Sequence, residues 1–145
     1  MSIGDERKSS KDGIELTLAT NVIGPLYLNS LLLDVLKAAK PSRVIYVSSA
    51  LYKYAETRWD DLEHQKLEPF KGQTAYKNSK LVGNMVFMHL NKLIEKEGIK
   101  VVLLHPGVIR TDLARNYFTT VGRKVAVVLL YPLIYFVTKN VTQGS

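Results

Sequence analysis

An apolar segment ending in serine, a long amphipathic stretch and a second apolar segment ending in Pro-Gly follow one another along this chain. The spacing of their apolar residues predicts a strand over 43–48, a helix over 74–97 and a strand over 100–104. In this order, the three elements form a right-handed crossover between parallel strands. The sequence therefore predicts an α/β fold. Ser49 and Pro106-Gly107 should emerge at the carboxyl edge of the sheet, where open α/β folds bind ligands.

Another helix is predicted upstream, over 13–39, with apolar residues around much of its circumference. Such a pattern indicates a heavily buried helix. Residues 1–12 are polar and of mixed charge, and we expect them to form a disordered lead-in. The chain has 145 residues, 46% of them apolar, which suits one domain better than two. That domain is predicted to occupy 13–145.

Tyr76 and Lys80 are the most informative pair of polar residues. They are four positions apart on the predicted helix and therefore share a face. An isolated tyrosine has a pKa of about 10. A lysine ammonium about 4–5 Å away favours the ionised phenol by about 3–4 kcal/mol at an effective dielectric constant near 20. Such a phenol exchanges a proton with an alcohol or a carbonyl near neutral pH, and Ser49 can hydrogen-bond the same substrate oxygen.

The same spacing recurs at Tyr135 and Lys139. That second pair lies in an apolar run, and no strand ending in serine precedes it. We interpret it as a chance match, because the bare pattern is common and only its context gives it chemical meaning.

The arrangement of Ser49, Tyr76 and Lys80 resembles the short-chain dehydrogenase/reductase family. Asn21 matches an asparagine that the family keeps on the preceding helix, and Pro106, Gly107 and Thr111 match its Pro-Gly-x-x-x-Thr motif. The stretches around Asp12-Gly-Ile-Glu, Pro41–Ser49 and His105–Leu113 are similar to the retinol-dehydrogenase-like branch, as is the long gap between the serine and the tyrosine. The resemblance extends over nearly the whole chain.

The resemblance implies an oxidoreductase that interconverts a lipophilic alcohol and its carbonyl, of retinol or steroid size, with NAD(P)(H) and some preference for NADP. Tyr76 would exchange the proton and Ser49 would orient the substrate oxygen. Lys80 would assist Tyr76, and both would contact the cofactor together with Pro106, Gly107 and Thr111. Asn21 would hold a water on a proton relay through Lys80.

Two features depart from the family pattern. Pro25 follows Asn21 on the same helix, where it removes a backbone donor and weakens the case for a water at Asn21. No glycines have the Gly-x-x-x-Gly-x-Gly spacing that binds a dinucleotide pyrophosphate at a helix N-terminus. The fold is therefore expected to be a partial Rossmann fold, a doubly wound parallel sheet without the N-terminal dinucleotide-binding half. Residues 13–145 would be its central and C-terminal part, truncated at both ends.

A second interpretation is open, in which the chain is catalytically silent and serves as an interaction piece. It would form a homodimer or heterodimer through the helices at 13–39 and 74–97, the surfaces that the family often uses to dimerise. Structural roles are also open for single residues. Ser49 could complete a turn, Asn21 could bond a neighbouring backbone group, and Thr111 could cap a helix.

The composition argues against two other classes of function. The net charge of +7 comes from scattered lysines and arginines with no interleaved aromatic residues, so no nucleic-acid partner is predicted. The chain has no cysteine, and its three histidines lack a ligand spacing, so no metal site is predicted either.

An uninterrupted apolar and aromatic run occupies 125–137, with Arg123 and Lys124 before it and Lys139 after it. It is shorter than the roughly 20 residues that span a bilayer. We expect either a lid over a lipophilic substrate or a segment that touches a membrane surface peripherally. The protein is accordingly expected to be intracellular, either cytoplasmic or membrane-associated.

Overall fold

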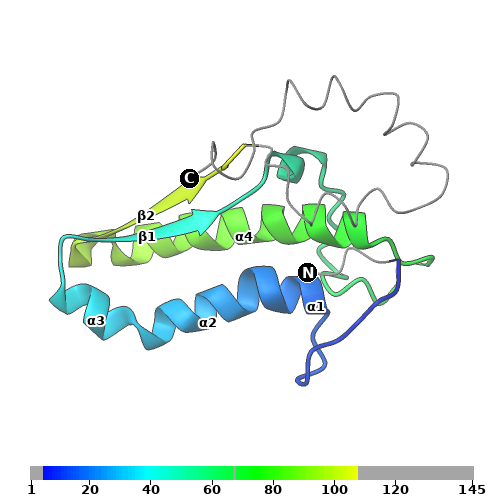
Figure 1. The fold of residues 1–145 in the computed structure, drawn as a ribbon, viewed down its shortest axis with the longest axis horizontal. Helices are drawn as coiled ribbons and strands as arrows, with labels where there is room; N and C mark the ends of the chain where they lie inside the picture. The colour runs from blue at the N-terminus through cyan, green and yellow to red at the C-terminus, as the bar shows by residue number, and fades with distance from the viewer. Residues whose placement is uncertain (1–4, 67, 108–145) are drawn as a thin grey trace, which may run out of the picture. The chain divides into compact units, whose positions relative to one another are not determined.

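Two parallel strands and the long helix that connects them form the centre of the structure (Figure 1). Strand β1 is Ser42–Val47, helix α4 is Gly72–Ile94 and strand β2 is Ile99–Leu104. The register pairs Ser42 with Ile99 and Val47 with Leu104. This confirms the predicted strand, helix and strand, with bounds that differ by at most three residues.

The computed structural model describes residues 5–66 and 68–107. Thr111, the Tyr135/Lys139 pair and the apolar run at 125–137 lie outside the described residues. The chain divides into two compact units, and every element discussed below belongs to the unit Gly4–His105. Within the described ranges, no helix is long and apolar enough to cross a membrane.

The predicted helix over 13–39 is divided into several pieces. Glu15 caps its start, since its buried carboxylate accepts hydrogen bonds from the backbone N–H groups of Thr17 and Leu18. At Leu32 the backbone turns to φ −92° and ψ 0°, which interrupts the helix. In order, the pieces are α1 (Leu16–Leu18), the π-helical segment η1 (Ala19–Ile23), α2 (Gly24–Leu31) and α3 (Leu33–Ala38).

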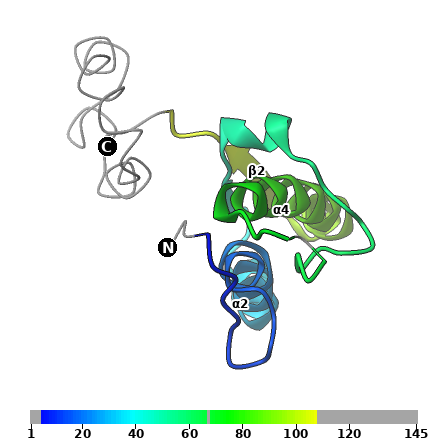
Figure 2. The same cartoon turned by 90° about the vertical axis from the view of Figure 1, so that its right-hand side faces the viewer.

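The predicted heavy burial of this helical stretch is wrong for α2 and α3. Neither helix contains a buried residue, and the side chains of Leu31 and Val35 are 63% and 64% exposed. Both views place α2 beside α4 and away from the strands (Figures 1 and 2). Two strands about 5 Å apart form a surface that one helix nearly covers. Only Leu33 and Leu36 of α3 reach the core.

The core lies between α4 and one face of the sheet. The strands alternate, so that Val44 and Tyr46 of β1 point inward against Phe87 of α4. The rings of Tyr46 and Phe87 stack with their centroids 4.3 Å apart. Burying one such aliphatic or aromatic side chain contributes roughly 1.5–3 kcal/mol. The remaining buried members are Ile94, Ile99 and Val101.

Helix α4 ends at Ile94, three residues before the predicted end at 97. The short 3₁₀ segment η3 (Glu95–Glu97) continues it, and Gly98 then adopts φ +80°. Glycine tolerates this left-handed conformation without the steric cost that a Cβ brings. The turn at Gly98 leads directly into β2 and thereby sets the strand register.

The polar excursion between β1 and α4 begins with the 3₁₀ helix η2 (Ala50–Tyr54). Asn78 of α4 holds it farther along, because its side-chain amide accepts from the N–H of Glu56 (2.9 Å) and donates to the carbonyl of the same residue (3.2 Å). The excursion is therefore attached to the first turns of α4 as well as to β1.

The lead-in is described from residue 5 onward, and residues 1–4 lie outside the described part. Arg7 donates to the carbonyl of Glu63 and forms an ion pair with its carboxylate. The N–H of Leu16 donates to the carbonyl of Lys8 (2.8 Å). Disorder was expected for 1–12, but residues 7 and 8 make specific contacts with the rest of this unit.

Candidate active site

Lys80 reaches from α4 to the carboxyl end of β1. Its Nζ donates a hydrogen bond of 2.9 Å to the backbone carbonyl of Val47, two residues before Ser49. The crossover geometry explains this reach, because α4 packs against the sheet with its N-terminal half beside the strand end. Burial lowers the pKa of Lys80 from its ordinary value. The ammonium is thus held in a partly desolvated position.

Tyr76 lies one helical turn before Lys80 and is half-buried. The Nζ of Lys80 is 5.7 Å from the centroid of the Tyr76 ring. At this range a cation is attracted by the face of an aromatic ring. The structure therefore brings the predicted tyrosine and lysine together at the strand end.

Ser49 follows β1 in an extended conformation, with φ −147° and ψ 142°. Its Oγ accepts a hydrogen bond of 3.3 Å from the N–H of Leu51 and so caps η2. The hydroxyl keeps its own proton for donation, because capping uses only an acceptor lone pair. His105, at the end of β2, accepts from the N–H of Ala50 through Nδ1 (3.3 Å). The two strand ends are thus linked beside Ser49.

Asn21 lies in the π-helical segment η1 and is buried. Its Nδ2 donates to the hydroxyl of Ser79 (2.9 Å), which itself donates to the backbone carbonyl of Tyr76 (2.7 Å). π-Helical turns inside α-helices are rare and are often found at functional sites. The asparagine is therefore connected to the backbone of the predicted proton-transfer residue through one hydroxyl group.

Three residues at this site were not identified from the sequence: Ser79, Tyr46 and Gly83. The hydroxyl of Tyr46 donates to the backbone carbonyl of Asn21 (3.0 Å). The Nζ of Lys80 lies 5.5 Å from the centroid of the Tyr46 ring. Burial, followed by the electrostatic influence of Tyr76, raises the pKa of Tyr46 to about 12. The phenol therefore stays protonated at neutral pH.

Gly83 makes room for that phenol. A Cβ at this position would lie 2.0 Å from the hydroxyl oxygen of Tyr46. Two sequence signals could have drawn attention to the pair: a phenol at an inward position of an apolar strand, and a glycine in the interior of a helix.

Three of the predicted cofactor residues lie outside the unit Gly4–His105. Pro106 and Gly107 fall in the other compact unit, and both are exposed. Gly107 has φ +85°, a conformation that favours glycine. Thr111 lies outside the described residues.

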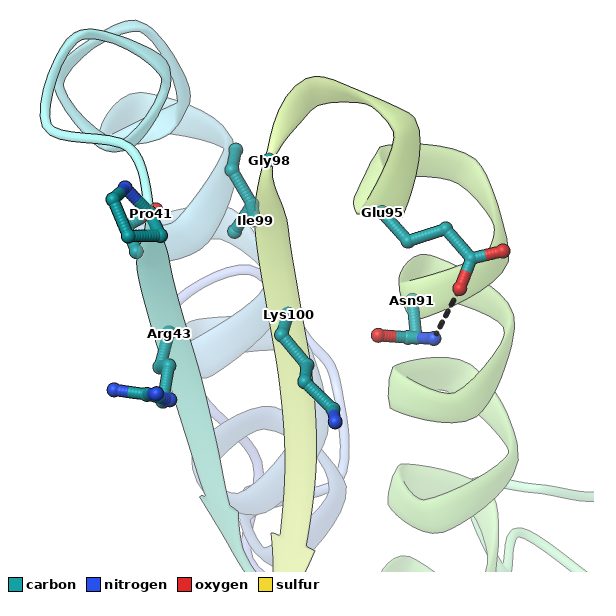
Figure 3. Close-up of a pocket in the computed structure, with 8 residues that line it drawn as sticks. Pro41, Arg43, Asn91, Glu95, Gly98, Ile99 and Lys100 are labelled. Carbon is teal, nitrogen blue, oxygen red and sulfur yellow. Dashed lines mark hydrogen bonds between the residues drawn. The ribbon is translucent and has the colours of Figure 1, made fainter.

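A pocket of about 370 Å³ lies at the opposite, amino-terminal ends of the strands (Figure 3). Arg43 and Lys100 line its sheet side, and Asn91 donates to the carboxylate of Glu95 on its helix side. None of the predicted site residues lines this pocket. Across residues 5–66 and 68–107 there is also no group of three or more histidine, aspartate or glutamate side chains arranged to hold a metal ion.

The chain is similar to proteins of known activity. It is 36% identical over 107 residues to human retinol dehydrogenase 14, which covers 74% of this chain and 31% of that protein. It is 37% identical over 108 residues to human retinol dehydrogenase 13, with 74% and 32% covered. It is 31% identical over 143 residues to the WW domain-containing oxidoreductase of Gallus gallus, with 94% and 33% covered. No family model matches the chain.

Solved structures share the fold. An uncharacterised protein from Mycobacterium paratuberculosis superposes with a TM-score of 0.62 at 25% identity, which covers 80% of this chain and 42% of that one. The carbonyl reductase Sniffer of D. melanogaster gives a TM-score of 0.51 at 22% identity, with 78% and 47% covered, and shows the fold alone. The described elements are thus part of a Rossmann-type sheet.

The strand–helix–strand unit, with tyrosine and lysine together at the strand end, defines the class of protein. The chain belongs to the short-chain dehydrogenase/reductase family. Within that family, its similarity is to the retinol dehydrogenases. It spans about a third of the length of the curated relatives that it matches.

Proposed function

We propose that this chain carries the proton-transfer half of an NAD(P)-dependent oxidoreductase that interconverts a lipophilic alcohol and its carbonyl. The observation that carries the proposal is the position of the Lys80 ammonium. It is bonded to the end of β1 and lies 5.7 Å from the centroid of the Tyr76 ring. A fixed positive charge beside a phenol favours the ionised phenol.

Each residue then has a defined part in the chemistry. In the oxidation direction, the Tyr76 phenolate takes the proton of the substrate hydroxyl, and Lys80 stabilises the negative charge before the transfer. Ser49 donates a hydrogen bond to the substrate oxygen while charge develops on it. Asn21 holds the first turns of α4 through Ser79 and so fixes the position of Tyr76.

The donors that remain suit a nicotinamide dinucleotide. Lys80 has three N–H donors, and the bond to Val47 uses one, which leaves two for ribose hydroxyls. The hydroxyl of Tyr76 would also contact the ribose. Pro106, Gly107 and Thr111 are proposed to contact the nicotinamide end of the cofactor. When bound, this cofactor supplies or accepts the hydride. We favour NADP(H) over NAD(H) as the partner.

The substrate proposal is a lipophilic alcohol of retinol or steroid size. It is supported by the similarity to proteins named retinol dehydrogenases. The apolar run at 125–137 is proposed as a lid over such a substrate or as a peripheral membrane contact. We accordingly propose an intracellular location, either cytoplasmic or at a membrane surface.

A titration of the purified chain with NADPH and NADH, followed by reduced-nicotinamide fluorescence, tests the proposal. Saturable binding is expected, and Lys80→Met should weaken it at least tenfold, because the ribose loses its charged donor. Lys92→Met is the matched control, since Lys92 lies on the same helix about three turns after Lys80. Equal binding by both variants, or no binding at millimolar cofactor by a folded chain, would contradict the cofactor site.

A second candidate function, association with another chain, is supported by a separate observation. The exposed faces of α2 and α3 carry a run of large apolar side chains: Tyr27, Leu28, Leu31, Leu32 and Val35. Exposed apolar surface of this extent marks interaction sites. We propose that two chains, or this chain and a relative, associate through this face and α4. Sedimentation equilibrium tests this, because Leu31→Lys should yield a monomer where the wild type is a dimer, and a monomeric wild type would contradict it.

A further inference from the structure

The side chain of Tyr46 contacts two of the proposed site residues, Asn21 and Lys80. Its side chain is only 5% exposed, and its hydroxyl donates to the backbone carbonyl of Asn21 at 3.0 Å. The face of its ring lies 5.5 Å from the Nζ of Lys80. One buried side chain on β1 therefore contacts both the π-helical segment η1 and the catalytic face of α4.

The carbonyl of Asn21 has no α-helical partner. In an α-helix, a carbonyl accepts from the N–H of the residue four positions later. For Asn21 that residue is Pro25, which has no N–H. Asn21 lies in the π-helical segment η1 and is buried, and buried backbone carbonyls are nearly always paired. The hydroxyl of Tyr46 donates to this carbonyl at a position where Pro25 cannot.

The ring of Tyr46 has little freedom to move. Phe87 stacks on it with an interplanar angle of 15°. The backbone of Gly83 approaches so closely that a Cβ there would lie 2.0 Å from the hydroxyl oxygen and 2.6 Å from the carbon that bears it. The strand fixes the other end of the side chain. A rigid phenol can hold its partners in one arrangement more effectively than a long aliphatic chain can.

We propose that Tyr46 is a positioning residue of the active site. Its hydroxyl fixes the backbone of Asn21 through a hydrogen bond, and the face of its ring attracts the ammonium of Lys80 and holds it near Tyr76. The inference rests on the proposed roles of Asn21 and Lys80. It adds a structural link between them, which runs through β1. It also gives Pro25 a place in the site, as the residue that leaves the Asn21 carbonyl open to a side-chain donor.

Two aspects of the electrostatics agree with this role. Burial raises the pKa of Tyr46 to about 12, so its hydroxyl remains a neutral donor throughout the physiological range. Burial lowers the pKa of Lys80, and attraction to the negative face of the ring opposes part of this loss of hydration. A neutral phenol can thus support a cation without competing for its proton.

The first test measures the titration of Lys80 by NMR in chain labelled with ¹³C at lysine Cε, with the signal assigned by Lys80→Arg. Tyr46→Phe keeps the ring and should leave the titration midpoint within about 0.3 units of wild type. Tyr46→Leu keeps an apolar neighbour but removes the aromatic face, and should lower the midpoint by about 0.5–1 unit. An unchanged midpoint in Tyr46→Leu would overturn the support of Lys80 by the ring.

The second test is a double-mutant cycle between Tyr46 and Pro25, measured by urea unfolding. Tyr46→Phe removes the donor from the Asn21 carbonyl and should lower the midpoint of unfolding. Pro25→Ala restores a backbone N–H four residues after Asn21, so the same Tyr46→Phe change made in that background should cost less than half as much. Strictly additive effects would show that the hydroxyl and Pro25 do not act on the same carbonyl.

Neither measurement needs turnover or bound cofactor, so the failure of this inference is distinct from the failure of the proposed oxidoreductase activity. In an active form, Tyr46→Phe should lower kcat more than it raises KM, because it displaces groups that act on the reacting oxygen. A purely structural role would lower the amount of folded protein and leave both constants of the folded fraction unchanged.

Discussion

Lys80 is held by groups of two kinds, a backbone carbonyl and the faces of two aromatic rings. The hydrogen bond to the carbonyl orients one N–H of the ammonium, whereas an aromatic ring attracts the charge without using an N–H donor. Two N–H bonds of Lys80 therefore remain available to a ligand. The proposed function needs such free donors, because Lys80 would act on Tyr76 and also contact the ribose of the cofactor.

Tyr76→Phe isolates the proton-transfer step. The hydroxyl is lost, but the half-buried ring that faces Lys80 remains, so the free energy of unfolding should change by less than about 0.5 kcal/mol. Turnover of the alcohol should fall by about 10²–10⁴-fold. Steady-state kinetics and urea unfolding of the same preparations check both expectations. Retained turnover would exclude Tyr76 as the proton donor and acceptor.

The raised pKa of Tyr46 has a consequence for stability at alkaline pH. Unfolded Tyr46 loses its proton near pH 10, whereas the folded residue keeps it to about pH 12. In that window the unfolded state binds fewer protons, so stability falls as the pH rises. Urea unfolding of wild type and Tyr46→Phe at pH 9 and 11.5 measures this. The stability advantage of the wild type should shrink at the higher pH, and a constant advantage would contradict the shift.

At the scale of single elements, α4 contains a conflict between helix propensity and packing. Gly83 lies in its interior, where alanine is ordinarily favoured by about 1 kcal/mol. A Cβ there would collide with Tyr46. Overpacking of this kind typically costs about 1–3 kcal/mol.

Gly83→Ala should therefore destabilise the protein, against the trend of its propensity. In a Tyr46→Leu background the aromatic ring is gone, and the same substitution should become neutral or stabilising. Thermal unfolding of the four proteins checks the sign. A stabilising Gly83→Ala in the wild-type background would show that the contact is not close in solution.

The crossover could be predicted from sequence because its elements have distinct periodicities and clear ends. Gly98 terminates α4 as expected, and β2 begins at the next residue. The upstream helix is less predictable, because apolar residues around its circumference indicate burial only where a neighbouring element covers them. Burial depends on how wide the covered sheet is. In the described unit, two strands leave α2 uncovered.

The candidate site likewise has residues that sequence predicts and residues that only the folded structure identifies. Tyr76 and Lys80 could be placed together because helical spacing alone determines their shared face. Tyr46 could not, because its role depends on a carbonyl 25 positions away in the sequence that only the folded chain brings within 3.0 Å. Pro25 was recognised as a disturbance of the helix, but its compensation by a side chain from β1 is a tertiary effect.

At the scale of the whole molecule, the described unit exposes apolar residues on a second surface as well. The outer face of the sheet carries Ile45, Val47, Val102 and Leu104, all exposed. In doubly wound folds, both faces of the parallel sheet are covered by helices. The sheet of the described unit therefore has one face covered by α4 and one exposed face, and the chain spans about a third of the length of human retinol dehydrogenase 14.

The long excursion between β1 and α4 offers a test of how the unit is held together. Asn78→Ala removes both hydrogen bonds to Glu56 and should speed proteolytic cleavage within residues 57–71 severalfold, since the segment loses its attachment to α4. Asn29→Ala is the matched control, because it removes a side-chain bond to the Pro25 carbonyl within the first helical stretch. Equal cleavage rates in the two variants would contradict the attachment.

That attachment also has a mechanical meaning. The amide of Asn78, two residues after Tyr76, bonds both the N–H and the carbonyl of Glu56, so the excursion cannot separate from the helix there without breaking these two bonds. We expect the same pair of bonds to limit the motion both of the excursion and of the helical turn that contains Tyr76.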